Sequence, residues 1–255
     1  MVKRHVLVIG CAFWLALPLH AAAAESAEER LGSVAAAKIM AVSPPVSTRS
    51  VQAYVNLLGY ALATNSRTKY SWRFGIVDSA DVNAFGLPGG IVLVSRGLVN
   101  LLRSEDELAF VLSHEIAHVA RQHHYRVILR QRLAEQAMTE LAAETGVSDV
   151  ALQGASAQLF ARGVDRSAEF EADRLAVELM TRTGYDPAAA LGVLEALGQL
   201  RGDEKRAEWL FSTHPTPSQR VDELLSSGIA DLPTAAGAVM RTARFEKFKA
   251  DLRSP

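Results

Sequence analysis

The 255-residue sequence has a formal net charge of −1 and is 49% hydrophobic, which is enough apolar material for one sizeable core. A near-neutral charge without a run of Lys or Arg excludes a typical nucleic-acid-binding protein. The only cysteine is Cys11, so no disulfide forms within the chain, and a metal ion would be held by histidine and carboxylate ligands.

Residues 1–24 have the pattern of a signal peptide. A basic start is followed by an apolar core at 6–19 and an A-x-A cleavage site that ends at Ala24. The apolar core is too short to span a bilayer comfortably. We therefore expect a periplasmic protein whose mature chain begins at Glu25 and has no transmembrane span; lipoprotein anchoring at Cys11 is the minor alternative, because the apolar run continues beyond it.

The first half of the mature chain alternates helical and strand patterns. Residues 26–40 and 49–63 have helical apolar spacing and are predicted as covering helices. Residues 70–77 alternate as a strand does, 81–90 are rich in turn-forming residues and predict a loop, and 91–94 predict a second strand.

A helix is predicted to begin after Ser104. The Ser104 side chain can accept a hydrogen bond from the Glu107 amide while the Glu107 side chain reaches back, which is a capping box. No Gly or Pro follows until Gly146, so we expect this helix to continue through Arg121 to position 143, with room for a bend.

Helices are predicted for most of the remaining chain, because caps, prolines and glycines stand at the expected ends. They cover 166–182 (capped by Asp165, ended by Gly184), 187–200, 217–226 (capped by Thr216) and, more weakly, 148–160 and the tail from 237. The fold class is therefore α+β: a mostly helical single domain over 25–255, with its core at about 50–225 and a small β-sheet.

Inside the helix after Ser104 lies His114-Glu115-x-x-His118. Residues i and i+4 share one helix face, so the two imidazoles can hold one metal ion while Glu115 acts on a water molecule. The other histidines after residue 24 are His123, His124 and His214. This clustering favours a metal site over the alternative, a buried helix whose two histidines are only hydrogen-bonded.

Catalytic zinc typically has three protein ligands and one open position, so a third ligand is needed. His124 has the spacing of H-E-x-x-H-x-x-G-x-x-H, but Arg121 stands where that pattern has its glycine. A continuing helix would rotate His124 away from His114 and carry it about 15 Å along the axis. We therefore do not expect His124 to bind the metal.

Glu169 is the preferred third ligand. It lies one turn before Asp173, which could accept the distal N–H of a ligating histidine. Glu171 points to another side of the helix and has no such partner. The alternative interpretation of this segment is a charged helix face with Glu–Arg pairs.

The ordered motifs have a known counterpart. They are Asn83-Ala84-Phe85, the Pro88-Gly89-Gly90 turn and strand, H-E-x-x-H, Glu169-x-Glu171-Ala172-Asp173 and His214-Pro215. Together they resemble the zinc metallopeptidase family that includes CAAX prenyl proteases, HtpX-like proteases and soluble periplasmic relatives. The resemblance implies a zincin-like metallopeptidase domain whose edge strand flanks the active-site helix. It also implies one Zn²⁺ per chain on His114, His118 and Glu169.

The expected reaction is peptide-bond hydrolysis. Glu115 would take a proton from the attacking water and pass it to the leaving amine, with Asp173 supporting a ligand. His214 and Arg220 are candidates to stabilise the carbonyl oxygen. In similar soluble proteins the histidine of the His-Pro segment can instead occupy the open metal position, so His214 is either a stabiliser or a removable plug.

The substrate is expected to bind as an extended strand along the edge of residues 90–94, including Gly90, Ile91 and Val92. Asn83 and Phe85 would shape the entrance. This arrangement predicts a zinc endopeptidase for unfolded or misassembled cell-envelope polypeptides, including outer-membrane proteins. The alternative function is a chaperone-like quality-control module with a latent zinc site.

Overall fold

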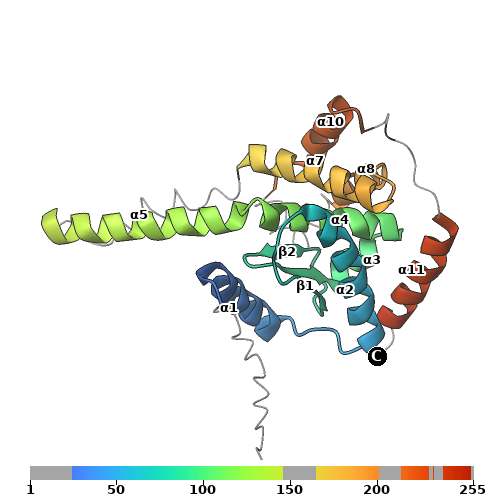
Figure 1. Ribbon diagram of the computed structural model, residues 1–255, viewed down its shortest axis with the longest axis horizontal. Coiled ribbons are helices and arrows are strands. Elements are labelled where there is room, and N and C mark those ends of the chain that lie inside the picture. The colour runs from blue at the N-terminus through green and yellow to red at the C-terminus, as the bar shows by residue number, and fades with distance from the viewer. Residues whose placement is uncertain (1–24, 146–164, 201–213, 230–231, 233–237, 254–255) are drawn as a thin grey trace, which may run out of the picture.

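Helices surround a small sheet in the computed structural model, which describes residues 25–145, 165–200, 214–229, 232 and 238–253 (Figure 1). The prediction of a mostly helical α+β fold is confirmed. The predicted signal peptide at 1–24, with Cys11, and the weak helix at 148–160 lie outside the described residues. Within the described part of the chain, no helix is both long enough and apolar enough to cross a bilayer.

The predicted helices agree with the observed ones to within a few residues, except around residue 121. In chain order the elements are α1 (Ala27–Val42), α2 (Arg49–Ala63), η1 (Thr64–Ser66), β1 (Arg73–Val77), β2 (Ala84–Leu87), β3 (Ile91–Ser95), α3 (Arg96–Leu101), α4 (Glu105–Ala120), α5 (His123–Thr145), α7 (Arg166–Thr183), α8 (Ala189–Gln199), α10 (Pro217–Ser226) and α11 (Ala238–Arg253).

The sheet has the strand order β1-β3-β2, with β1 parallel and β2 antiparallel to β3. The prediction of a loop throughout 81–90 is wrong, because residues 84–87 form β2. Gly86 and the following turn concealed this four-residue strand; Gly89 and Gly90 adopt φ of 78° and 93°, which only glycine adopts easily. The prediction that 90–94 offers a free edge is also wrong, because β3 is the central strand and pairs on both sides.

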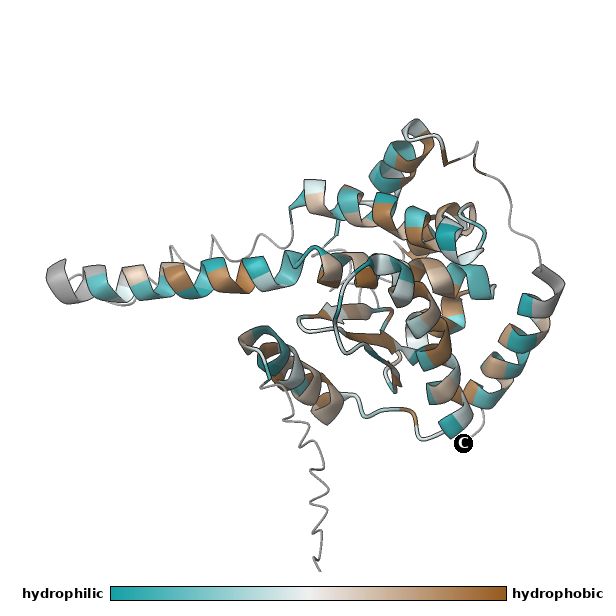
Figure 2. Cartoon of the chain, viewed as in Figure 1, coloured by the Kyte–Doolittle hydropathy of each residue, from teal (hydrophilic) through white to brown (hydrophobic). Residues whose placement is uncertain are grey.

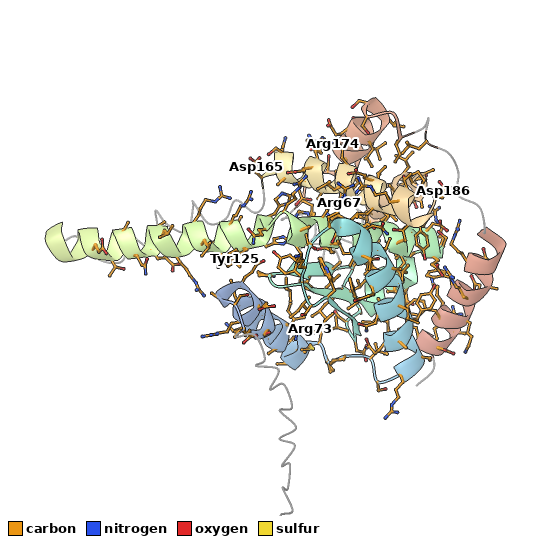
Figure 3. All side chains as sticks on the ribbon, in the orientation of Figure 1. Arg67, Arg73, Tyr125, Asp165, Arg174 and Asp186 are labelled. Atoms are coloured by element: carbon orange, nitrogen blue, oxygen red, sulfur yellow. The ribbon has the colours of Figure 1, made fainter. Side chains whose placement is uncertain are left out.

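The sheet is covered on both faces. The larger apolar cluster joins β1 and β3 to α2, α4, α7 and α8, and hydrophobic segments gather in this central part of the molecule (Figure 2). The other face of β3 packs against Ala36 of α1 through Ile91 and Leu93. Gly32 lets α1 approach closely, since a Cβ there would lie 1.8 Å from the Pro88 carbonyl oxygen. At the periphery, Arg174 Nη1 bonds Glu223 Oε1 at 2.8 Å and links α7 to α10 (Figure 3).

The N-terminus of α4 is anchored by buried carboxylates. Ser104 accepts from the Glu107 amide as predicted, but the Glu107 carboxylate bonds the Arg103 amide at 2.6 Å, so the capping box is incomplete. Glu105 accepts hydrogen bonds from the hydroxyls of Tyr54 and Tyr185 and from the Arg244 guanidinium. These contacts fix the start of α4 against α2, the α7–α8 connection and α11.

The other end of α4 contradicts the predicted continuous helix. The helix stops at Ala120, and Gln122 adopts a left-handed conformation with φ of 56° before α5 begins. Such a conformation costs a non-glycine residue about 1–2 kcal/mol. It is held in place because Nε2 of the Gln122 side chain donates to Glu28 Oε2 at 2.7 Å and to the Tyr70 hydroxyl at 3.3 Å. These side-chain contacts stabilise a left-handed residue one position after Arg121, which stands where the sequence pattern has glycine.

The outer edge of β1 is closed by side chains of α2. Gln52 Oε1 accepts from the Ile76 amide at 3.0 Å, and Gln52 Nε2 donates to the Ile76 and Val46 carbonyls at 2.8 and 2.9 Å. Asn56 likewise accepts a hydrogen bond from the Phe74 amide through Oδ1 and donates one to the Phe74 carbonyl through Nδ2. A polar helix face therefore replaces a fourth strand.

We expect Gln52→Leu to lower the free energy of unfolding by about 1–3 kcal/mol, because it leaves the buried main-chain groups of Ile76 without these partners. Urea denaturation measures the change. Gln136→Leu, on the exposed part of α5, is the matched control and should change stability by less than about 0.5 kcal/mol. Equal effects of the two substitutions would contradict this role for Gln52.

Candidate metal centre

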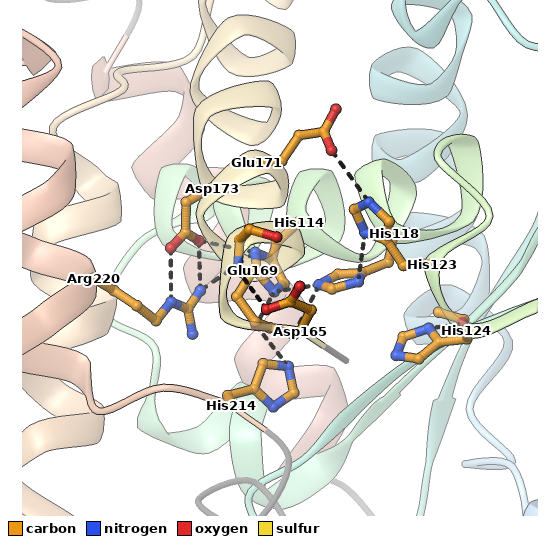
Figure 4. A network of polar contacts seen from close by, with 12 residues as sticks. His114, His118, His123, His124, Asp165, Glu169, Glu171, Asp173, His214 and Arg220 are labelled. Carbon is orange, nitrogen blue, oxygen red and sulfur yellow. Dashed lines mark hydrogen bonds and ion pairs between the residues drawn. The ribbon is translucent and has the colours of Figure 1, made fainter. Parts of the chain in front are cut away.

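Four side chains from three parts of the chain converge beside β2. His114 and His118 lie on α4, Glu169 on α7, and His214 just before α10 (Figure 4). One potential ligand atom of each lies within 4.8 Å of the others. Because α4 packs directly against α7, residues about fifty positions apart meet at one point.

The separations suit a small tetrahedral cation. The Nε2 atoms of His114 and His118 are 3.0 Å apart, and they lie 3.6 and 3.5 Å from the two Glu169 carboxylate oxygens. His214 Nε2 is 3.5 Å from Glu169 Oε2. Ligand bonds of 2.0–2.1 Å in a tetrahedron place neighbouring donor atoms about 3.3 Å apart. The nitrogen and carboxylate donor set is also one that zinc prefers.

Glu169 provides an independent test of this fit. Its side chain is fully buried, and neither carboxylate oxygen has a hydrogen-bond partner among the described residues. Burial opposes its ionisation, but His114, His214 and Arg220 outweigh that effect and lower its pKa. An ionised, fully buried carboxylate without a hydrogen bond has lone pairs available to a cation, so the site fits a divalent metal.

Asp173 and Arg220 determine how His114 presents its nitrogens. Asp173 Oδ1 lies 2.9 Å from His114 Nδ1, and Arg220 donates to both Asp173 oxygens at 2.8 and 2.6 Å. Burial opposes ionisation of Asp173, but Arg220 and His114 hold its pKa well below the usual range. An ionised Asp173 accepts the Nδ1 proton, so the Nε2 lone pair of His114 faces the other ligand atoms.

The imidazoles differ in their tendency to take a proton. Burial and Arg220 oppose protonation of His114, but the Asp173 and Glu169 carboxylates outweigh them and raise its pKa to about 9 without a metal. Burial lowers the pKa of His118 well below its ordinary value and that of His214 to about 4. His118 and His214 are therefore neutral at pH 7 and offer lone pairs.

Glu115 lies beside this group and is almost fully buried. Burial raises its pKa, and a hydrogen bond from the Gly86 amide partly offsets that rise. A Cβ on Gly86 would lie 2.8 Å from both the main-chain oxygen and Oε2 of Glu115. Sequence reasoning missed Gly86; its only signal was a glycine inside an apolar run, which favours close approach of another backbone.

The remaining sequence candidates divide clearly. Glu171 turns away from the metal group, and its carboxylate lies 2.9 Å from Arg121 Nε and 3.4 Å from His123 Nε2. His124 is outside the group of converging ligand atoms, as predicted, but not because a continuous helix carries it away from His114. Since α4 ends before it, His124 stacks on the His118 ring at 4.9 Å and its Nδ1 lies 2.9 Å from the Gly86 carbonyl oxygen.

The predicted substrate-binding residues are placed differently from expectation. Phe85 packs with the cluster under α1, on the sheet face opposite α4, so it does not shape the entrance. Asn83 is buried just before β2. Gly90, Ile91 and Val92 lie at or in the central strand. The cavity that adjoins His114, Glu115, His214 and Arg220 has an apolar lining made of Ala84, Leu98, Phe110, Val111, Val193 and Leu197.

Comparisons with known proteins agree with this geometry. The family model described as Peptidase family M48 matches residues 45–227. The Beta-barrel assembly-enhancing protease of Yersinia pestis is 29% identical over 208 residues, covering 77% of this chain and 43% of that protein. The Mitochondrial metalloendopeptidase OMA1 of Arabidopsis thaliana is 32% identical over 169 residues, covering 66% and 34%. The chain therefore spans less than half the length of these relatives.

We expect zinc to stabilise the folded protein, because the ligands converge only when α4 and α7 are packed together. Zinc at one hundred times its Kd should add about 2.7 kcal/mol to the free energy of unfolding. Denaturation of metal-free protein with and without added zinc measures this. Glu169→Gln keeps the shape but loses the charge, and should abolish most of the gain; a zinc-dependent gain unchanged in this variant would contradict the ligand role.

Proposed function

This chain belongs to peptidase family M48, and on that premise we propose that it is a metalloendopeptidase that cleaves unfolded or misassembled cell-envelope polypeptides with one zinc ion on His114, His118 and Glu169. The observation that carries the proposal is the buried Glu169 carboxylate, which has no hydrogen-bond partner among the described residues and faces His114, His118 and His214. A zinc ion held there would polarise the substrate carbonyl and make water a nucleophile near neutral pH.

Glu115 is the general base and then the general acid. Its carboxylate takes a proton from the attacking water and delivers that proton to the leaving amine. The burial that raises its pKa improves the second step, because a carboxyl with an ordinary pKa holds a proton poorly at neutral pH. The Gly86 amide keeps the carboxylate in position through its hydrogen bond.

Arg220 supports the site indirectly. Its guanidinium makes two hydrogen bonds to Asp173, so its main effect is to keep Asp173 ionised and His114 oriented.

Two roles remain open for His214. It can stabilise the carbonyl oxygen of the substrate, or it can occupy a metal position until substrate displaces it. The position of His214 Nε2 among the potential ligand atoms supports the second role.

The substrate main chain is proposed to pair with β2 instead of β3. Asn83, Phe85 and Leu87 form the alternate register positions whose main-chain groups face β3, as the 2.9 Å bond from the Ser95 amide to the Asn83 carbonyl indicates. The main-chain groups of Ala84 therefore point to the outer edge, and Ala84 also lines the cavity beside Glu115. Main-chain pairing recognises extended polypeptide of any sequence.

The cell envelope is proposed as the location. The predicted signal peptide supports export, and the relative from Yersinia pestis is named for enhancing β-barrel assembly. Outer-membrane proteins are therefore the proposed substrate class.

The second candidate function is a chaperone-like module with a latent site. The position of His214 Nε2 among the potential ligand atoms favours it, because His214 would there block the metal.

We expect Glu115→Gln to lower kcat for an unfolded polypeptide by at least about 10²-fold, because it removes the proton acceptor while the zinc ligands remain. Cleavage of a fluorogenic unfolded substrate measures the rate, and elemental analysis verifies one zinc per chain. Cleavage at the wild-type rate would overturn the protease mechanism. Client binding without any cleavage by the wild-type protein would favour the chaperone-like module.

We expect His214→Ala to increase the cleavage rate while weakening zinc binding, because a neutral histidine leaves the metal position that water needs. Initial rates and zinc titration on the same preparation measure both effects. A fall of about 10²–10³-fold in kcat with unchanged zinc binding would instead assign His214 to stabilisation of the carbonyl oxygen.

A further inference from the structure

A row of polar contacts leads away from the metal group on the side opposite Asp173. His118 Nδ1 lies 3.2 Å from His123 Nδ1, and His123 Nε2 lies 3.4 Å from Glu171 Oε2 (Figure 4). We propose that His123, held by Glu171, is a positioning residue that orients His118 and strengthens its bond to the metal. This inference rests on the proposed function, because it requires His118 to be a zinc ligand.

The direction of each hydrogen bond follows from the ligand geometry. His118 turns Nε2 toward His114 and Glu169, so Nε2 must carry the lone pair and Nδ1 must carry the proton. That proton can be accepted only if His123 Nδ1 is unprotonated. The proton of neutral His123 then lies on Nε2, where the Glu171 carboxylate accepts it. One tautomer of each ring satisfies all the contacts.

The arrangement gives each proposed histidine ligand its own acceptor. His114 donates its distal N–H to Asp173, which Arg220 holds, while His118 donates to His123, which Glu171 holds. Such acceptors fix the ring orientation and increase the basicity of the ligating nitrogen. His124 does not serve this purpose, because it contacts the face of the His118 ring and directs Nδ1 to the Gly86 carbonyl.

The position of His123 depends on the turn after α4. The left-handed conformation of Gln122 interrupts the helix, so that the ring of His123 at the start of α5 lies against His118, five positions earlier. His123 is only 7% exposed, whereas the Glu171 side chain is 40% exposed and also bonds Arg121. The buried ring thus connects a surface carboxylate to a ligand in the interior.

The test compares His123→Leu with His123→Gln in the full chain. Leucine removes the acceptor, and we expect the Kd for zinc to rise by about 10–100-fold. Glutamine carries an oxygen that can accept from His118 and an amide that can donate to Glu171, so zinc binding should remain near the wild-type value. Competition with a chelator measures the Kd for zinc, and the absorption spectrum of the cobalt-substituted protein reports ligand geometry.

A second pair of variants isolates Glu171. Glu171→Ala should weaken zinc binding and alter the cobalt spectrum, whereas Arg121→Ala, which removes only the partner of that ion pair, should change neither. If His123→Leu does not fold, the comparison of Glu171→Ala with Arg121→Ala still tests whether Glu171 acts on His118 through His123. Zinc binding within about twofold of wild type in both His123→Leu and Glu171→Ala, or equal losses in Glu171→Ala and Arg121→Ala, would overturn the inference. Failure of the wild-type protein to bind zinc would instead refute the proposed function.

Discussion

One buried carboxylate determines the organisation of this protein. Glu169 is removed from water without a hydrogen-bond donor among the described residues, and an uncompensated buried charge costs several kcal/mol. A metal cation shared with the neighbouring imidazoles would add to the compensation that His114, His214 and Arg220 already provide. Two features bring the imidazoles to that carboxylate: α4 packs closely on α7, and His214 lies just before α10.

The surrounding structure makes α4 a rigid support for the site. Glu105 ties the start of the helix to Tyr54, Tyr185 and Arg244, while the Gln122 turn, held by Glu28 of α1, ends it two residues after His118. The sheet contributes through Gly86, whose missing side chain admits the Glu115 carboxylate. Elements that carry no ligand therefore determine where the ligands and the base lie.

Sequence reasoning located the converging residues and the longer described helices, though not the short α3, because local signals sufficed. The 3.6-residue periodicity and the caps Ser104 and Asp165 defined helices, and the i, i+4 spacing placed Glu169 and Asp173 on one face. It failed where distant contacts decide conformation. Gln122 turns the chain because Glu28 and Tyr70 hold its side chain, although neither is near it in sequence. Residues 84–87 form a strand because β3 pairs with them, and strand order is not encoded in either segment alone.

The most direct test of the central claim is the metal's inner shell, measured by X-ray absorption on the zinc-loaded protein and on Glu169→Gln. The account predicts four nitrogen and oxygen neighbours at about 2.0–2.2 Å in the wild-type protein, including at least two imidazoles, with a changed shell or lost zinc in the variant. Zinc with the same shell and occupancy in both proteins would show that Glu169 does not bind it, and the account would be contradicted.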